Sequence, residues 1–186
     1  MPFELTVEAP GGELRLAYPR RDNFESWAAL RRANIDYLRP WEPDVSVAGL
    51  NKSAYRVRVG RLKKLIQQDR AYPFYVFFGD ALVGACNITH VERGATQSAR
   101  IGYWIGEKYT GQGFAQASVQ AVTHFCFHRL VLHRVDAAVQ CDNLASIKVL
   151  QASGYTYEGT ARSLLNINGV WRDHDIYARL IGDKSA

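Results

Sequence analysis

The spacing between apolar residues changes several times along the chain, and each kind of spacing predicts a helix or a strand. Between residues 72 and 91, apolar side chains are almost continuous apart from Gly79-Asp80, which is typical of two buried central strands joined by a turn. Before them, Tyr55 and Val59 begin a series at helical spacing whose opposite face is rich in arginine and lysine. Strict alternation around Val135 predicts a further strand.

These patterns together predict about 6–7 strands and about 4 helices in a mixed α/β arrangement, because strands and helices do not alternate regularly. The strands are expected at residues 13–18, 72–78, 81–91, 99–105, 134–140, 155–165 and 170–180. The helices are expected at residues 22–34, 51–69, 116–129 and 144–152. Residues 166–169 read as a hairpin turn between the last two strands.

One loop stands out between the first two helices. Pro40 and Pro43 bracket Trp41 and Glu42, and proline excludes regular helix both at its own position and just before it. We therefore expect an aromatic side chain and a carboxylate held on a stiff loop.

Composition narrows the class of protein. The chain has 186 residues, of which 47% are hydrophobic and 22% charged, as expected for a single globular domain over residues 1–186. It has no apolar run long enough to span a membrane, and its acidic N-terminal stretch does not resemble a signal peptide. Cys86, Cys126 and Cys141 show no CxxC spacing, which favours buried, reduced thiols and a cytoplasmic location.

The net charge of +5 suits an anionic cofactor or a site near RNA. No basic patch interleaved with aromatic residues is present, so direct binding of nucleic acid is not predicted.

Candidate chemistry is concentrated in residues 102–115, GYWIGEKYTGQGFA. A strand, a loop containing Gly111 and Gly113, and a helix start follow one another there. Such a junction exposes unpaired backbone N–H groups to an anion, so the loop is a candidate pyrophosphate site. Neither GxGxxG nor GxxxxGK[ST] is present, and a plain tight turn is an equal alternative on these residues alone.

The order of the motifs resembles the GNAT superfamily of acyl-CoA N-acetyltransferases, and within it the RimJ/RimL-type ribosomal-protein N-acetyltransferases. Gly113 and Ala115 match the last two named positions of the signature (Arg or Gln)-x-x-Gly-x-(Gly or Ala), whereas Thr110 departs from the first. The resemblance covers roughly residues 10–182 and includes GYWI at 102–105. Its other matching segments are Asn143–Ser146, Gly154-Tyr155, Glu158-Gly159, Leu38–Pro43 and Gly169–His174.

This resemblance implies a fold and a co-substrate. The fold is one mostly antiparallel sheet that is splayed between its fourth and fifth strands, at residues 99–105 and 134–140. The co-substrate is acetyl-CoA, whose pantetheine arm pairs with the open edge of the first of these strands. The residues implied in binding it are Trp104, Ile105, Gly106, Thr110, Gly111, Gln112, Gly113, Phe114, Ala115, Asn143 and Ser146.

The resemblance also suggests proton-transfer groups. Ser146 is implied near the sulfur, as an acid or as a group that holds a water molecule. Tyr155 is a second candidate acid, although a place in the core is the favoured interpretation. Asn143 suits helix capping as well as cofactor contact. Related enzymes often carry a glutamate where this chain has Arg100, so Glu42 is the substitute base, acting directly or through water.

The remaining candidates concern the acceptor and metals. Trp41 and Glu42, with Trp171 and Asp173, are expected to form the acceptor groove; packing and a surface ion pair are the alternatives for the latter two. His124 and His128 lie one helical turn apart, but without an HExxH glutamate no metal site is predicted.

The resulting expectation is an N-acetyltransferase that passes the acetyl group directly from acetyl-CoA to a primary amine. The acceptor implied by the resemblance is a protein N-terminal α-amine, with ribosomal proteins as the type. A small amine such as a polyamine or antibiotic is one alternative, and a non-catalytic acyl-CoA-binding regulatory protein is another. A monomer and a homodimer are both compatible with the sequence.

Overall fold

The computed structural model describes residues 3–43 and 49–183, which build one mixed sheet of eight strands. Its order is β1-β2-β3-β4-β5-β6-β8-β7, and all neighbours are antiparallel except β5 and β6. The strands are β1 (Glu4–Ala9), β2 (Gly12–Ala17), β3 (Tyr72–Phe78), β4 (Ala81–Glu92), β5 (Ser98–Ile105), β6 (Arg134–Gln140), β7 (Thr156–Ile167) and β8 (Val170–Leu180).

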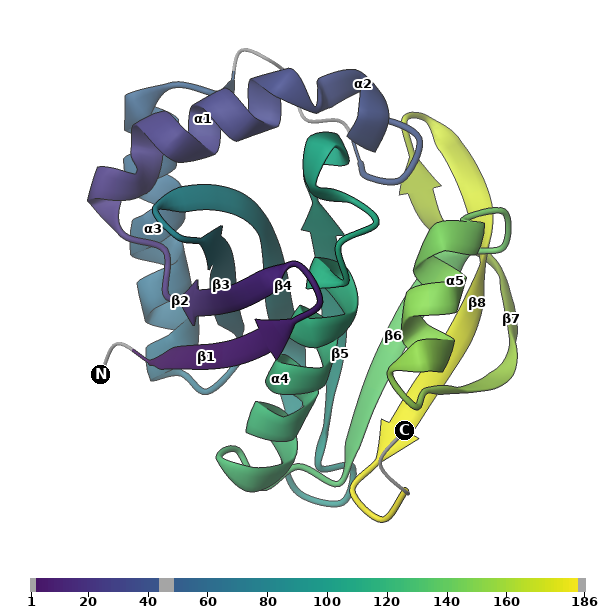
Figure 1. Ribbon diagram of the computed structural model, residues 1–186. Coiled ribbons are helices and arrows are strands. Elements are labelled where there is room, and N and C mark those ends of the chain that lie inside the picture. Colours follow the sequence, from purple (N-terminus) through teal and green to yellow (C-terminus); the bar gives the residue numbers. More distant parts are fainter. Residues whose placement is uncertain (1–2, 44–48, 184–186) are drawn as a thin grey trace.

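The helices cover both faces of this sheet. They are α1 (Phe24–Ala33), the short α2 (Ile35–Leu38), α3 (Lys52–Gln67), α4 (Phe114–His128) and α5 (Leu144–Ala152). In Figure 1, α4 and α5 lie in front of the sheet and α3 lies behind it, while α1 and α2 run across the top. The predicted mixed α/β fold is confirmed.

The strand missing from the prediction is β1. Its side chains alternate between exposed and half-buried, and the whole strand pairs with β2 at the sheet edge. A short edge strand without a fully buried position carries little apolar signal. The prediction of about 6–7 strands is therefore corrected to eight.

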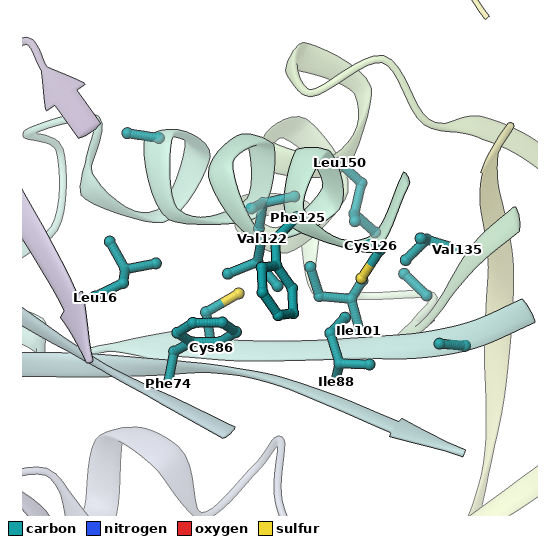
Figure 2. Close-up of a cluster of buried hydrophobic side chains, with 14 of the residues drawn as sticks. Leu16, Phe74, Cys86, Ile88, Ile101, Val122, Phe125, Cys126, Val135 and Leu150 are labelled. Atoms are coloured by element: carbon teal, nitrogen blue, oxygen red, sulfur yellow. The ribbon is translucent and has the colours of Figure 1, made fainter. Parts of the chain in front are cut away.

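The larger core lies between the sheet and α4. Figure 2 shows Phe125 and Cys126 of α4 facing Phe74, Cys86 and other side chains of the strands. Burial raises the pKa of the Cys126 thiol to about 12 and raises that of Cys86 as well. Cys141, in contrast to the expectation of three buried thiols, is exposed.

The sheet is split between β5 and β6. These parallel strands pair only at Ser98–Arg100 with Arg134–Asp136, and beyond this point they diverge toward the top of Figure 1. The splay expected between these two strands is thus confirmed. Within the described ranges, no helix is long and apolar enough to cross a membrane.

Candidate functional site

A cleft of about 890 Å³ fills the space between the diverging strands. One wall is made by Phe114 and Ala115 of α4 together with Ser146 of α5, on the front face of the sheet. The other wall is made by Trp27 of α1 and Arg58 of α3, on the opposite face. The cleft therefore passes through the sheet and reaches both of its faces.

The glycine loop closes one end of the cleft. Gly113 is the N-cap of α4 and has a left-handed backbone with φ of 76°. A Cβ atom at Gly113 would lie 2.5 Å from Cδ of Pro10, so only glycine fits there. The backbone N–H of Gly11 donates to the carbonyl of Gln112 at 3.1 Å, so the turn between β1 and β2 supports the loop.

The loop presents donors to the cleft. The first N–H groups of α4 have no partner within the helix, and the helix dipole favours an anion at this end. Gly111 has φ of 73°, and a Cβ built there would meet no atom within 4 Å, so the space beside it is open. The Thr110 hydroxyl is turned away and donates to the carbonyl of Glu107 at 2.8 Å. The main groups of this loop that can bind an anion are therefore its backbone N–H groups.

Beyond the β5–β6 pairing, β5 has an open edge. The N–H of Gly106 donates to the carbonyl of Val83 at 2.8 Å, which fixes the hydrogen-bond register with β4. Because successive peptide groups of a strand face opposite sides, Trp104 and Gly106 direct their backbone N–H groups to β4. Tyr103 and Ile105 direct theirs to the cleft.

Ser146 is held at this edge by two neighbours. Its backbone N–H donates to Oδ1 of Asn143 at 3.1 Å, so Asn143 does cap α5. The Ser146 hydroxyl and the Tyr103 hydroxyl lie 2.8 Å apart, and the Tyr103 hydroxyl donates to the Ser146 carbonyl at 3.0 Å. Burial raises the pKa of Tyr103, so its phenol stays protonated and its hydrogen bonds position the serine oxygen.

The opposite wall carries a buried cation. Arg31 is only 7% exposed, and its Nη2 donates to Oε2 of Glu42 at 2.6 Å. The same guanidinium lies over the ring of Trp104, 4.9 Å from its centre. Glu42 and Trp41 both line the cleft, so this wall combines an ion pair with aromatic surface.

The loop that carries Trp41 and Glu42 is tied to the far half of the sheet. Nε2 of Gln140, on β6, donates to the carbonyl of Pro40 at 2.7 Å. Nδ2 of Asn168, in the turn between β7 and β8, donates to the carbonyl of Arg39. This loop therefore bridges the two diverging halves of the sheet. Its two prolines restrict the backbone and help to keep the loop in one conformation.

A comparison of the sequence with known protein families identifies the family of this chain. Residues 13–156 match the family model described as the acetyltransferase (GNAT) domain. The chain belongs to the GNAT acetyltransferase family. The expected family, its fold and its acetyltransferase activity are confirmed.

Relatives of this GNAT chain include named N-acetyltransferases. It is 35% identical over 172 residues to the probable N-acetyltransferase YjcK of Bacillus subtilis, which covers 91% of the chain and 87% of the relative. It is 31% identical over 147 residues to the [ribosomal protein uS5]-alanine N-acetyltransferase of Escherichia coli, covering 78% of the chain and 76% of the relative.

A solved structure agrees over the whole GNAT chain. Mycobacterium smegmatis RimJ, solved in complex with CoA-disulfide, superposes with a TM-score of 0.93 at 29% identity. The alignment covers 100% of this chain and 90% of RimJ.

The predicted donor-site residues of this GNAT chain mostly gather at the cleft. Those that line it are Trp104, Ile105, Thr110, Gly111, Gly113, Phe114, Ala115, Asn143 and Ser146. Gly106 and Gln112 lie just behind, with their backbone groups bonded to β4 and to the β1–β2 turn. The register adds Tyr103, which sequence reasoning missed because its partner Ser146 lies 43 residues further along the chain.

Three residues predicted for proton transfer or for the acceptor groove also fall outside the cleft lining. The Tyr155 hydroxyl lies 2.7 Å from the Thr123 hydroxyl in the hydrophobic core, and Tyr155 does not line the cleft. Trp171 is 62% exposed, and the Asp173 carboxylate accepts the backbone N–H of Ser163 at 2.7 Å. The β7–β8 hairpin instead lines the cleft with Leu165, Ile167 and His174.

No metal centre is found in the described part of the chain, where no three potential ligands cluster. His124 and His128 stack on α4 with ring centres 4.1 Å apart, outside the cleft.

Proposed function

We propose that this chain is an acetyl-CoA-dependent N-acetyltransferase that acts on the N-terminal α-amine of a protein, of the ribosomal-protein type. The observation that carries the proposal is the cleft that passes through the sheet, with backbone donors on one face and an aromatic, ion-paired wall on the other. Relatives named for acetylation of ribosomal proteins support the acceptor class. The CoA complex of RimJ supports the donor.

The donor is assigned to the front face. The N–H groups at Gly111–Ala115 would hold the pyrophosphate, since they combine free donors with a helix N-terminus. The open edge of β5, at Tyr103 and Ile105, would pair with the amide groups of the pantetheine arm. Gly111 and the open edge leave room for both, which is the fit that an extended phosphate-bearing ligand requires.

Acetyl-CoA supplies an activated acyl group as a thioester. The backbone N–H groups on the open edge would stabilise a carbonyl oxygen that gains negative charge. Ser146, held by Tyr103, would protonate or solvate the departing thiolate. A thiol pKa lies at about 8.5, so a weak acid such as a serine hydroxyl is sufficient. No covalent acyl-enzyme is needed, because the amine reaches the acyl carbon from the opposite face.

Replacing Ser146 with alanine tests the leaving-group role. We expect kcat to fall roughly ten- to hundredfold while the affinity for acetyl-CoA is retained, because the capping bond to Asn143 uses the backbone of residue 146. Steady-state kinetics and calorimetric binding of CoA check this. Thr110→Ser, which keeps the hydroxyl bonded to Glu107, is the matched control. Unchanged turnover in Ser146→Ala would remove Ser146 from proton transfer.

The proposed function is tested with a panel of acceptors. Purified protein is incubated with acetyl-CoA and peptides that begin with alanine or serine, and released thiol is measured. The same peptides with a blocked N-terminus, but with an internal lysine retained, are the control. Thiol release that depends on the free α-amine supports the proposal. Release with polyamines alone would move the acceptor to small amines, and tight donor binding without release on any amine would indicate a binding protein.

A further inference from the structure

A buried histidine in the cleft has no part in the chemistry described so far. His174 lies on β8, is only 3% exposed and lines the cleft on the side of the bridging loop. Its neighbours across the strands are Gln140 of β6 and Ala161 of β7, both uncharged. It therefore stands on the same side of the sheet as the residues that hold the loop of Trp41.

Its hydrogen bond fixes the position of the ring proton. Nδ1 of His174 lies 3.0 Å from the carbonyl oxygen of Arg172. A carbonyl can only accept, so Nδ1 carries the hydrogen and donates it. In the neutral ring the lone pair then resides on Nε2. Nε2 has no hydrogen-bond partner among the residues that the structure describes, and the ring borders the cleft.

The other charged groups of the cleft are less suited to accept a proton. Glu42 is already bound to the guanidinium of Arg31 at 2.6 Å, so its Oε2 atom is engaged by another donor. Arg100 is a permanent cation. The charged side chains that line the cleft together with His174 are Glu42, Arg31, Arg58 and Arg100. Arg172 lies on the same strand as His174, whereas Asp173 and Asp175 project from the other face of β8.

We propose that His174 is the proton acceptor for the attacking amine, an inference that rests on the proposed acetyl transfer. Nε2 takes one proton from the acceptor ammonium, directly or through one water, and leaves a neutral amine. The amine nitrogen forms a bond to the acetyl carbon, and the carbon–sulfur bond breaks. The second proton lost by the nitrogen goes to the sulfur, so CoA leaves as a thiol and His174 returns its own proton to solvent.

The experiment compares pH profiles of kcat/KM for the acceptor in three proteins. His174→Asn keeps an N–H donor for the Arg172 carbonyl but has no basic nitrogen, and Glu42→Gln is the matched variant of the rival base. A free α-amine has a pKa of about 8, so few acceptor molecules are neutral at pH 7. We expect His174→Asn to lower kcat/KM about a hundredfold at pH 7, with the deficit shrinking to less than about tenfold at pH 9.5. CoA affinity should stay unchanged, and any deficit in Glu42→Gln, which loses a charge of the acceptor wall, should be the same at both pH values.

Other results overturn the proposal. A deficit in His174→Asn that is the same at every pH indicates a structural role, and activity within twofold of wild type at pH 7 excludes the base. A larger pH-dependent deficit in Glu42→Gln returns the role to Glu42. If His174→Asn does not fold, the pH profile of the wild type alone still tests the proposal. The proposal is overturned if kcat/KM between pH 6 and pH 9.5 simply follows the fraction of acceptor molecules whose amine is neutral. If the wild type acetylates a polyamine and no peptide, the proposed acceptor class is wrong. The pH profiles of the three proteins measured with the polyamine then still test the role of His174.

Discussion

Replacing Gly102 with valine is expected to abolish most of the acetyl transfer while making the protein more stable. Gly102 lies in the middle of β5, lines the cleft on the face of Arg100 and Trp104, and has no atom within 4 Å of a Cβ built on it. In the proposed function a valine there would fill space that the acceptor needs, and displacement of a reacting group by about 1 Å can cost about a hundredfold in rate. Glycine inside a strand is itself unfavourable, so valine should add about 0.5–1 kcal/mol of stability.

Gly60→Ala provides the control for Gly102→Val. Gly60 lies inside α3, has no atom within 4 Å of a built Cβ and does not line the cleft. The substitution should raise stability by a similar amount and leave activity unchanged. Thermal unfolding and kcat/KM measured on both variants separate the two effects. Full activity in Gly102→Val would mean that the acceptor does not cross β5 at this position.

Gly113→Ala is expected to damage both the fold and donor binding. The new Cβ would lie 2.5 Å from Pro10, and alanine would have to adopt a left-handed backbone. The two effects together should cost at least about 2 kcal/mol, which lowers the melting temperature by roughly 4–8 °C. Relief of the clash moves the loop away from the β1–β2 turn. The Kd for CoA should therefore rise more than about tenfold, because the loop's N–H groups no longer converge.

Gly111→Ala is the matched variant for Gly113→Ala. It shares the left-handed backbone with φ of 73° but meets no neighbour, so it should lose only about 1–2 kcal/mol. Differential scanning calorimetry and titration with CoA measure both quantities. Equal losses in the two variants would show that the contact with Pro10 contributes nothing.

The sequence was sufficient for the parts of the fold that have a strong local signal. The apolar run at Tyr72–Phe78 and the helical series from Tyr55 onward lie where they were predicted. The edge strand β1 escaped prediction because none of its residues is fully buried. The four-residue helix α2 escaped because it lies directly before the break at Pro40.

The site shows a different limit, which comes from the two-residue period of strands. Alternation correctly grouped Trp171 with Asp173 on β8, but it could not say which of the two faces borders the cleft. The face that borders the cleft proved to be that of His174. The same ambiguity affected β5, where the backbone groups on the open edge are those of Tyr103 and Ile105 and not of Trp104. Only the pairing with a neighbouring strand resolves such a choice.

The passage of the cleft through the sheet has a consequence for the traffic of the two substrates. In the proposed function, the donor binds on the face of α4 and α5, and the acceptor approaches along the wall on the face of α1 and α3. A long peptide therefore does not need to thread past the nucleotide, and spent CoA does not need to wait for the acetylated chain to depart. Entry from two opposite faces suits an acceptor that is itself part of a large folded particle. Only the free N-terminus of such an acceptor has to reach the thioester.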